Sequence, residues 1–279
     1  MQNPPSPSVG SSAPLRRWRR PVRQPTLQGD QVHVWRVPLE FSPTDVNWLS
    51  QVLSTDETDR SNRFKFNAHR NQFIVARAWL RIIIGSYLRV EPAELRFDYS
   101  SHGKPSLSKP FECDPGLNFN LAHSGKLALF GMTLERQIGI DVERISRDFP
   151  CEEIARLFFS SSEVAHLSSL PPAAQHRAFF NCWTRKEAFI KAKGLGLSLP
   201  LDQFDVALGA EEPTLLCTRW DESESARWSL HALDLDYGYV GAVAVEGRAV
   251  ELSLWQVDEK SIGRLREEDK HHAFYGLGS

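Results

Sequence analysis

The chain lacks the features of a secreted or membrane protein. Its 279 residues include only four cysteines, spaced more than thirty residues apart and without a CxxC pair. This spacing argues against a disulfide framework or a zinc site. The sequence also has no apolar signal region within residues 1–30 and no apolar run long enough to cross a bilayer. We therefore expect a cytoplasmic protein that does not bind membranes.

A dominant charge and a nucleophile motif are also missing. The formal net charge is -2, which gives no overall field to attract nucleic acid or an anionic membrane. No GxSxG elbow or other sign of a serine nucleophile occurs. The glycine-rich segment Gly194-Leu195-Gly196-Leu197 follows an expected helix instead of opening one, so we interpret it as a helix C-cap and not as a phosphate-binding loop.

The order of expected elements predicts an α+β fold of two similar halves. Residues 1–30 are predicted to be a disordered basic tail rich in Pro and Ser, residues 31–137 and 138–258 the two halves, and residues 259–279 a charged tail. Each half contains a long helix with a central tryptophan, Trp79 or Trp183, 104 residues apart. Two such halves would leave a cleft between them, where ligands commonly bind.

The hydrophobic patterns locate these elements. We expect strands at Val32 to Leu39, Leu95 to Tyr99, Leu117 to His123, Leu127 to Thr133, Ile138 to Ile145, Phe204 to Leu208, Trp228 to Leu235 and Tyr239 to Val245. We expect helices at Thr44 to Leu53, Asp56 to Leu88 with a turn near Phe66-Asn67, Glu152 to Ser160, Ser162 to Leu170 and Gln175 to Lys193.

The strand from Ile138 carries two carboxylates on one face. Because side chains alternate along a strand, Asp141 and Glu143 point away from Ile138, Ile140 and Val142. Two carboxylates so placed could reach one Mg²⁺ ion, which needs only one or two such ligands beside a substrate phosphate. On this pair alone, the polar face of a half-buried strand is the favoured interpretation.

The helix at Gln175 to Lys193 adds charges where apolar residues are expected. On a helical wheel Glu187 and Lys186 lie on the apolar side near Trp183, while Thr184 and Arg185 take the outer side. A buried charge is costly unless it is paired or binds a metal. Lys191, four residues after Glu187, could form an ordinary helix-surface pair, but that pair does not explain Glu187 beside Trp183.

Three basic or polar segments are candidates for phosphate binding. Lys104 lies in the turn Gly103-Lys104-Pro105, and His123 and Ser124 lie at a hairpin tip. Guanidinium groups bind phosphate in forked geometry. The arginines before and within the first long helix are Arg60, Arg63, Arg70, Arg77 and Arg81. Pairing with acidic residues elsewhere in the fold explains Arg77 and Arg81 at least as well.

The motifs in order resemble the 4′-phosphopantetheinyl transferases of the Sfp type. The matching segments are Gly103-Lys104-Pro105, Phe119 to Gly125, Gly139 to Glu143, Phe158-Phe159-Ser160 with Glu163, Trp183 to Lys191 and Gly194 to Leu197. The resemblance extends from about residue 55 to about residue 206. It implies an enzyme that moves the phosphopantetheine arm of coenzyme A onto a serine of a carrier protein and releases adenosine 3′,5′-bisphosphate.

The resemblance also implies roles for individual residues. Asp141, Glu143 and Glu187 would bind Mg²⁺. Lys191 and His123 would hold the phosphates, with Glu187, Lys191 and His123 acting in catalysis. The other residues implied to bind coenzyme A are Arg60, Arg63, Arg70, Lys104, Ser124 and Lys186. The serine proton would pass either to Glu187 or to a water held by Glu143.

The partners implied are acyl, peptidyl or polyketide carrier proteins and coenzyme A, with no nucleic acid, and the chain is expected to be a monomer. Fatty-acid, polyketide and nonribosomal-peptide carriers all remain open. Two other functions fit the residues: a non-catalytic module that binds coenzyme A or a carrier protein, and a Mg²⁺-dependent phosphodiesterase that uses water as the nucleophile.

Overall fold

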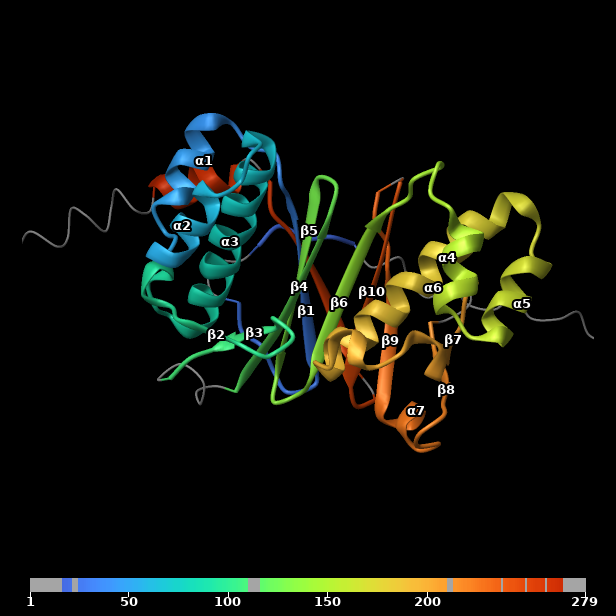
Figure 1. The fold of residues 1–279 in the computed structure, drawn as a ribbon. Helices are drawn as coiled ribbons and strands as arrows, with labels where there is room; N and C mark the ends of the chain where they lie inside the picture. Colours follow the sequence, from blue (N-terminus) through green and yellow to red (C-terminus); the bar gives the residue numbers. More distant parts are fainter. Residues whose placement is uncertain are drawn as a thin grey trace, which may run out of the picture.

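A computed structural model describes residues 17–21, 25–109, 116–209, 213–236, 238–248, 250–258 and 260–267. The fold is mixed α and β, as predicted, and has four layers (Figure 1). One group of helices covers a first sheet, a second sheet packs against the first, and another group of helices covers the second sheet. In the part of the chain that the structure describes, no helix is long and apolar enough to cross a membrane.

The first sheet has the strand order β11-β1-β5-β4. Its strands are β1 (Gln31–Pro38), β4 (Leu117–Ser124), β5 (Leu127–Leu134) and β11 (Glu251–Gln256). β4 and β5 form the expected hairpin, and β5 also pairs antiparallel with β1. β11 was not predicted and pairs parallel with β1, so the last strand of the chain returns to the first sheet.

The second sheet has the strand order β6-β10-β9, with antiparallel pairing throughout. Its strands are β6 (Ile138–Arg144), β9 (Trp228–Leu233) and β10 (Tyr239–Glu246). Between the two sheets lies an apolar layer that includes Val34, Leu129, Ile140 and Val243. β4 ends the first sheet and β6 ends the second, and these two edges lie together.

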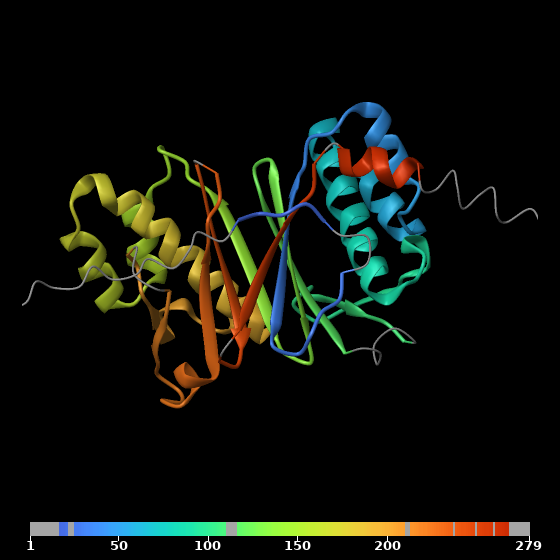
Figure 2. The same ribbon diagram turned by 180° about the vertical axis from the view of Figure 1, so that it is seen from behind.

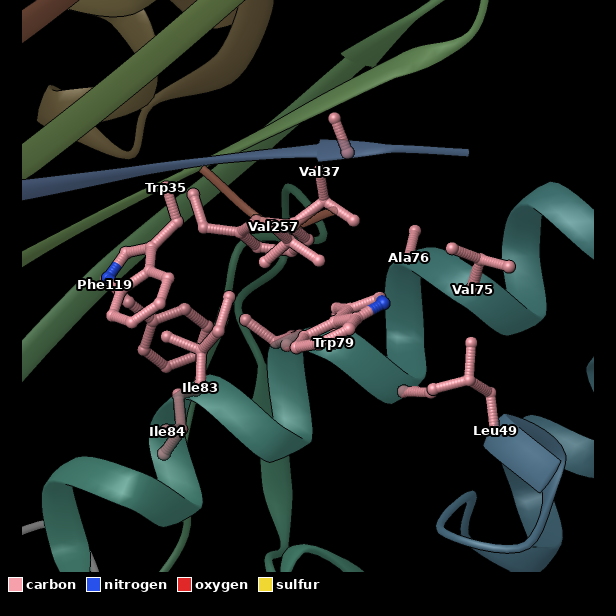
Figure 3. Close-up of a cluster of buried hydrophobic side chains, with 14 of the residues drawn as sticks. Trp35, Val37, Leu49, Val75, Ala76, Trp79, Ile83, Ile84, Phe119 and Val257 are labelled. Carbon is pink, nitrogen blue, oxygen red and sulfur yellow. The ribbon is translucent and has the colours of Figure 1, made fainter. Parts of the chain in front are cut away.

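On the outer side of the first sheet lie α1 (Pro43–Ser50) and α3 (Asn67–Leu88), which pack on the sheet, and α2 (Thr55–Asn62), which packs on α3. Figure 3 shows Trp35, Val37 and Phe119 of the sheet facing Trp79 and Ile83 of α3. Gly85 in α3 lies against the segment that follows the helix. This segment leads into a 3₁₀ helix at Pro92–Glu94. A small hairpin, β2 (Phe97–Tyr99) and β3 (Pro105–Leu107), follows.

The second sheet is covered by α6 (Pro172–Lys193), with α4 (Cys151–Phe158) and α5 (Ser161–Ser169) packed against it. α6 ends at Gly194, which has φ +69° and serves as the predicted C-cap. Short 3₁₀ helices at Gly196–Ser198 and Leu201–Gln203 lead into β7 (Phe204–Val206), which pairs with β8 (Leu215–Thr218). The four-residue α7 (Glu224–Arg227) precedes β9.

The structure corrects the prediction of disorder within residues 1–30. Residue 19 pairs with β11, and its N–H donates to Leu254 O at 2.9 Å. Trp18 packs on the apolar layer between the sheets and donates from Nε1 to Asp234 O at 2.7 Å. Figure 2 shows this blue segment running across the rear of both sheets. The tryptophan gives an otherwise polar stretch enough apolar surface to be held.

The C-terminal region differs from the prediction as well. Residues 260–267 are helical, and Ile262 is buried in the core between α1, α3 and the first sheet. Arg266 pairs with Asp45 at 3.0 Å. β11 lies within the expected half of residues 138–258 but pairs with β1 in the first sheet. The rest of the expected 259–279 tail lies outside the described residues.

A buried histidine in β1 predicts acid sensitivity. His33 hydrogen-bonds Tyr87 Oη at 2.7 Å, and burial lowers the pKa of His33 to about 4. The unfolded chain therefore takes up this proton near pH 6.5, before the folded chain does. We expect His33 to leave the free energy of unfolding unchanged above pH 6.5 and to lower it by roughly 3 kcal/mol by pH 4. His33→Gln should flatten the loss of stability between these pH values, measured by urea denaturation. An equal loss of stability between these pH values in the two proteins would contradict this expectation.

Candidate active site

β6 brings its two carboxylates to α6. Ile138, Ile140 and Val142 point into the apolar layer between the sheets, as the alternation predicted. Gly139 lies on the opposite face, where an added Cβ would come within 2.0 Å of Ala188 O in α6. This glycine lets the helix backbone lie directly on the strand. The residues after it, beginning with Asp141, therefore face α6.

Asp141 is only 4% exposed, so the interpretation of a solvated strand face is wrong for it. Its Oδ1 accepts from Lys191 Nζ at 2.6 Å, while its Oδ2 is buried without a hydrogen-bond partner. Burial raises the pKa of Asp141 to about 7; Lys191 opposes this rise, and Glu143 and Glu187 add to it. The site therefore holds more negative charge than Lys191 neutralises.

Glu143 from β6 and Glu187 from α6 both lie near the Asp141 carboxylate. Glu143 Oε2 accepts from Ser124 Oγ at 2.7 Å, which ties β6 to the end of β4. Glu187 is half-buried. Burial raises the pKa of Glu187, Lys191 lowers it, and Glu143 raises it further. The charge of Glu143 thus makes ionisation of both Asp141 and Glu187 more costly.

His123 joins this cluster from the first sheet. It is exposed at the end of β4. The pKa of His123 is lowered by desolvation in the surrounding protein and then by the Lys191 charge, while Glu143 acts in the opposite direction. The structure therefore brings together the predicted residues His123, Ser124, Asp141, Glu143, Glu187 and Lys191 from the two facing sheet edges and α6.

The donor set of this cluster suits a hard cation. Among the residues that the structure describes, no group of three or more His, Cys, Asp and Glu side chains is arranged to hold a metal ion. Asp141 Oδ1 and Glu143 Oε2 are engaged by Lys191 and Ser124. Asp141 Oδ2, by contrast, is buried without a hydrogen-bond partner, so this oxygen is free to accept a cation. Carboxylate oxygens are the ligands that Mg²⁺ prefers.

Lys104 reaches the second sheet from the β2–β3 turn. Its Nζ donates to Ile138 O at 3.2 Å and to Ala192 O at 3.3 Å, at the start of β6 and in the last turn of α6. Burial lowers the pKa of Lys104 to about 8. This lysine therefore joins the two halves beside the cluster, and two of its three N–H donors already have protein partners.

The predicted arginines fall into two groups. Arg60, Arg63 and Arg70 are exposed around the α2–α3 connection. This end of α3 lies next to the β4–β5 turn, because Gln72 Nε2 donates to Gly125 O at 3.2 Å. Arg77 and Arg81 are instead buried and both pair with Glu57, so the interpretation by ion pairing is confirmed for them.

Lys186 is not part of the cluster, which corrects its prediction as a coenzyme A ligand. Its ammonium is fully buried and pairs with Glu163 at 2.8 Å. The two other N–H groups donate to Leu201 O and Phe204 O. All three donors of this lysine are therefore used inside the C-terminal core. The pairing was missed because no helical or strand spacing relates positions 163 and 186.

The prediction that Thr184 and Arg185 lie on the exposed side of α6 is also wrong. Thr184 and Arg185 are buried, and Arg185 donates from Nη2 to Gly209 O at 2.9 Å. The helix contacts β6 and β10 on one side and α4 and α5 on the other. Burial on more than one side blurs the single apolar stripe that periodicity detects.

Comparison with known proteins places the chain in a family. The model of the 4′-phosphopantetheinyl transferase superfamily matches residues 137–244, and that of the 4′-phosphopantetheinyl transferase N-terminal region matches residues 39–133. The chain is 42% identical over 230 residues to 4′-phosphopantetheinyl transferase HetI of Nostoc sp., covering 82% of this chain and 94% of that protein.

Two further relatives are more distant. The 4′-phosphopantetheinyl transferase Sfp of Bacillus subtilis is 33% identical over 159 residues, covering 56% of this chain and 66% of Sfp. The crystal structure of Thermotoga maritima holo-[acyl-carrier-protein] synthase aligns with 40% of this chain and 63% of that chain, at 23% identity and a TM-score of 0.33, a likeness too low to support a conclusion. The two family matches and the relationship to HetI show that this chain is a member of the 4′-phosphopantetheinyl transferases.

Proposed function

We propose that this enzyme transfers the 4′-phosphopantetheine arm of coenzyme A to a serine hydroxyl of an apo carrier protein. The reaction would depend on Mg²⁺ and release adenosine 3′,5′-bisphosphate. The observation that carries the proposal is the buried Asp141 carboxylate, whose Oδ2 has no hydrogen-bond partner and which lies beside Glu143, Glu187 and Lys191. Membership of the transferase family supplies the identity of the group transferred.

Asp141, Glu143 and Glu187 are the residues that would hold Mg²⁺. The bound ion would supply positive charge to the pyrophosphate as the phosphorus–oxygen bond breaks. Lys191 and His123 would contact the same phosphates from α6 and β4. Lys191 already neutralises part of the carboxylate charge through its 2.6 Å contact with Asp141.

The remaining binding groups would hold the adenosine end of coenzyme A. Arg60, Arg63 and Arg70 are exposed guanidinium groups suited to the 3′-phosphate. Lys104 would add one donor from the β2–β3 turn, and Ser124 would act mainly through its bond to Glu143. A carboxylate with a raised pKa is the better proton acceptor, so Glu187 is one candidate base; a water held by Glu143 is the other.

We also propose that the chain is an ancient duplication with coenzyme A bound between its halves. Support comes from α3 and α6, which are each 22 residues long and are each followed by 3₁₀ helix and then a two-stranded hairpin; the 3₁₀ segment is one helix after α3 and two after α6. The proposed halves remain residues 31–137 and 138–258, with β11 exchanged into the first sheet. We propose a monomeric, cytoplasmic enzyme.

Intact-mass spectrometry tests this function directly. The purified chain, coenzyme A, Mg²⁺ and a panel of apo acyl, peptidyl and polyketide carrier proteins are incubated together. We expect at least one carrier to gain the mass of a single phosphopantetheine arm, and a carrier variant with its acceptor serine changed to alanine to gain none. Coenzyme A binding without a mass change on any carrier would instead indicate a binding module.

A further inference from the structure

The facing edges of the two sheets are joined by side chains. β4 and β6 are edge strands of different sheets, and an edge strand carries backbone N–H groups that need partners. Two of these groups in β6 are satisfied by side chains of β4. Asn120 Oδ1 accepts from Ile140 N at 2.9 Å, and Ser124 Oγ accepts from Arg144 N at 3.1 Å.

These two hydrogen bonds enclose the carboxylate pair. Asn120 and Ser124 are four residues apart and therefore point to the same face of β4. Their partners on β6 are also four residues apart, so the two strands are held at matching positions. Asp141 and Glu143 lie between the two anchored residues. Ser124 makes a further contact because its hydroxyl donates to Glu143 Oε2 at 2.7 Å.

The Asn120 contact lies at a tightly packed point. Asn120 is only 4% exposed and lies opposite Gly131 on β5. A Cβ at Gly131 would come within 2.7 Å of Ile138 Cδ1, so β6 approaches the first sheet closely here. Water cannot easily replace a lost partner at such a site, and the Ile140 N–H would remain unsatisfied or β6 would shift.

We propose that Asn120 and Ser124 are positioning residues that fix β6 so that Asp141 and Glu143 can bind Mg²⁺ together with Glu187. This inference rests on the proposed function, because it assigns a purpose to the same carboxylates. Asn120 is buried and acts on the backbone next to Asp141. Residues that orient metal ligands in this way typically alter metal affinity by about 10- to 100-fold when changed.

Asn120→Leu tests the first contact, with Thr133→Val as a matched control. Thr133 is also fully buried, lies on β5, and donates one hydrogen bond to Arg136 O at 2.7 Å. Mg²⁺ is titrated calorimetrically into each protein in the presence of saturating coenzyme A. We expect the Mg²⁺ Kd of Asn120→Leu to rise about 10-fold or more. Thr133→Val should lose similar stability and keep the wild-type Kd.

Ser124 provides a second pair of variants. Ser124→Ala removes both the acceptor for Arg144 N and the donor to Glu143, so the Mg²⁺ Kd should rise. Ser124→Thr keeps the hydroxyl on a strand that tolerates a branched side chain and should restore the affinity. If Asn120→Leu fails to fold, this pair still decides the question.

Amide hydrogen exchange separates the possible failures. In Asn120→Leu without metal, the Ile140 amide should exchange faster than in the wild type. Faster exchange combined with an unchanged Mg²⁺ Kd would overturn the positioning role and leave the proposed function intact. A wild-type protein that binds coenzyme A but no Mg²⁺ would overturn the metal assignment itself, and the positioning role with it.

Discussion

Asp141→Asn is expected to reduce transfer strongly while making the metal-free protein more stable at pH 8. The pKa of Asp141 is raised to about 7 from an ordinary 3.8, chiefly by burial. The folded chain therefore holds this proton more tightly than the unfolded chain. The resulting cost to stability is absent below pH 4, grows between pH 4 and 7, and reaches about 4 kcal/mol above pH 7.

The pKa of about 7 already includes the attraction of Lys191, so no further ion-pair energy is lost on substitution. Because the buried amide of Asn must still be kept from water, we expect a gain of about 2 kcal/mol at pH 8 and none near pH 4. Transfer should fall by roughly 10²- to 10³-fold or more, the loss typical of removing one group that stabilises charge in a transition state. Chemical denaturation and intact-mass assays measure the two effects.

Asp205→Asn is a control of opposite sign. The pKa of Asp205 is lowered: burial acts to raise it, but hydrogen bonds from Ser160, Ser162, Arg219 and Cys217 prevail. The control should therefore lose stability at pH 8 and retain transfer. An Asp141→Asn protein that is less stable than wild type at pH 8, or that transfers at the wild-type rate, would refute the assignment.

Glu57→Gln is expected to be the most destabilising single change among the charged residues of the helices that cover the first sheet. Glu57 Oε1 accepts from Arg77 Nε at 2.7 Å, and Oε2 accepts from Arg81 Nε at 2.6 Å. All three side chains are buried. Neutralising the shared carboxylate leaves two buried guanidinium charges without their partner, which costs about 3–5 kcal/mol.

Urea denaturation at pH 7 measures this loss, with Glu152→Gln as the matched control. Glu152 also pairs with an arginine, Arg156, but both side chains are exposed, so its loss should cost less than about 0.5 kcal/mol. Similar midpoints for the two variants would show that the buried triad contributes little. Burial acts to raise the pKa of Glu57, but Arg77 and Arg81 lower it, so its contribution should also disappear as the pH falls into the acid range.

The sequence allowed good predictions where a pattern is local. Alternation along β6 placed Ile140 and Asp141 on opposite faces, and the structure agrees. The long amphipathic helices and the β4–β5 hairpin were predicted within a few residues. These elements are specified by neighbouring residues, whose spacing decides which side chains share a face.

Predictions failed where a distant partner decides the outcome. Whether Lys186 meets a phosphate or Glu163 depends on the packing of α5 against α6, which spacing within either helix does not determine. The same holds for Trp18, whose indole donates to Asp234 O and whose neighbour at position 19 pairs with β11. In each case the missing information is tertiary contact, which overrides local preference.

The parallel pairing of β1 with β11 also sets the order of events during synthesis. The paired residues Gln31 and Glu251 are 220 positions apart. At the usual rate of translation, roughly 10 to 40 seconds separate the two strands as they leave the ribosome. During that interval β1 has an open edge that could pair with another chain. The first sheet is thus among the earliest parts of the protein to be made and the last to be completed. The N-terminal half can finish folding only after residues 251–256 have been synthesised.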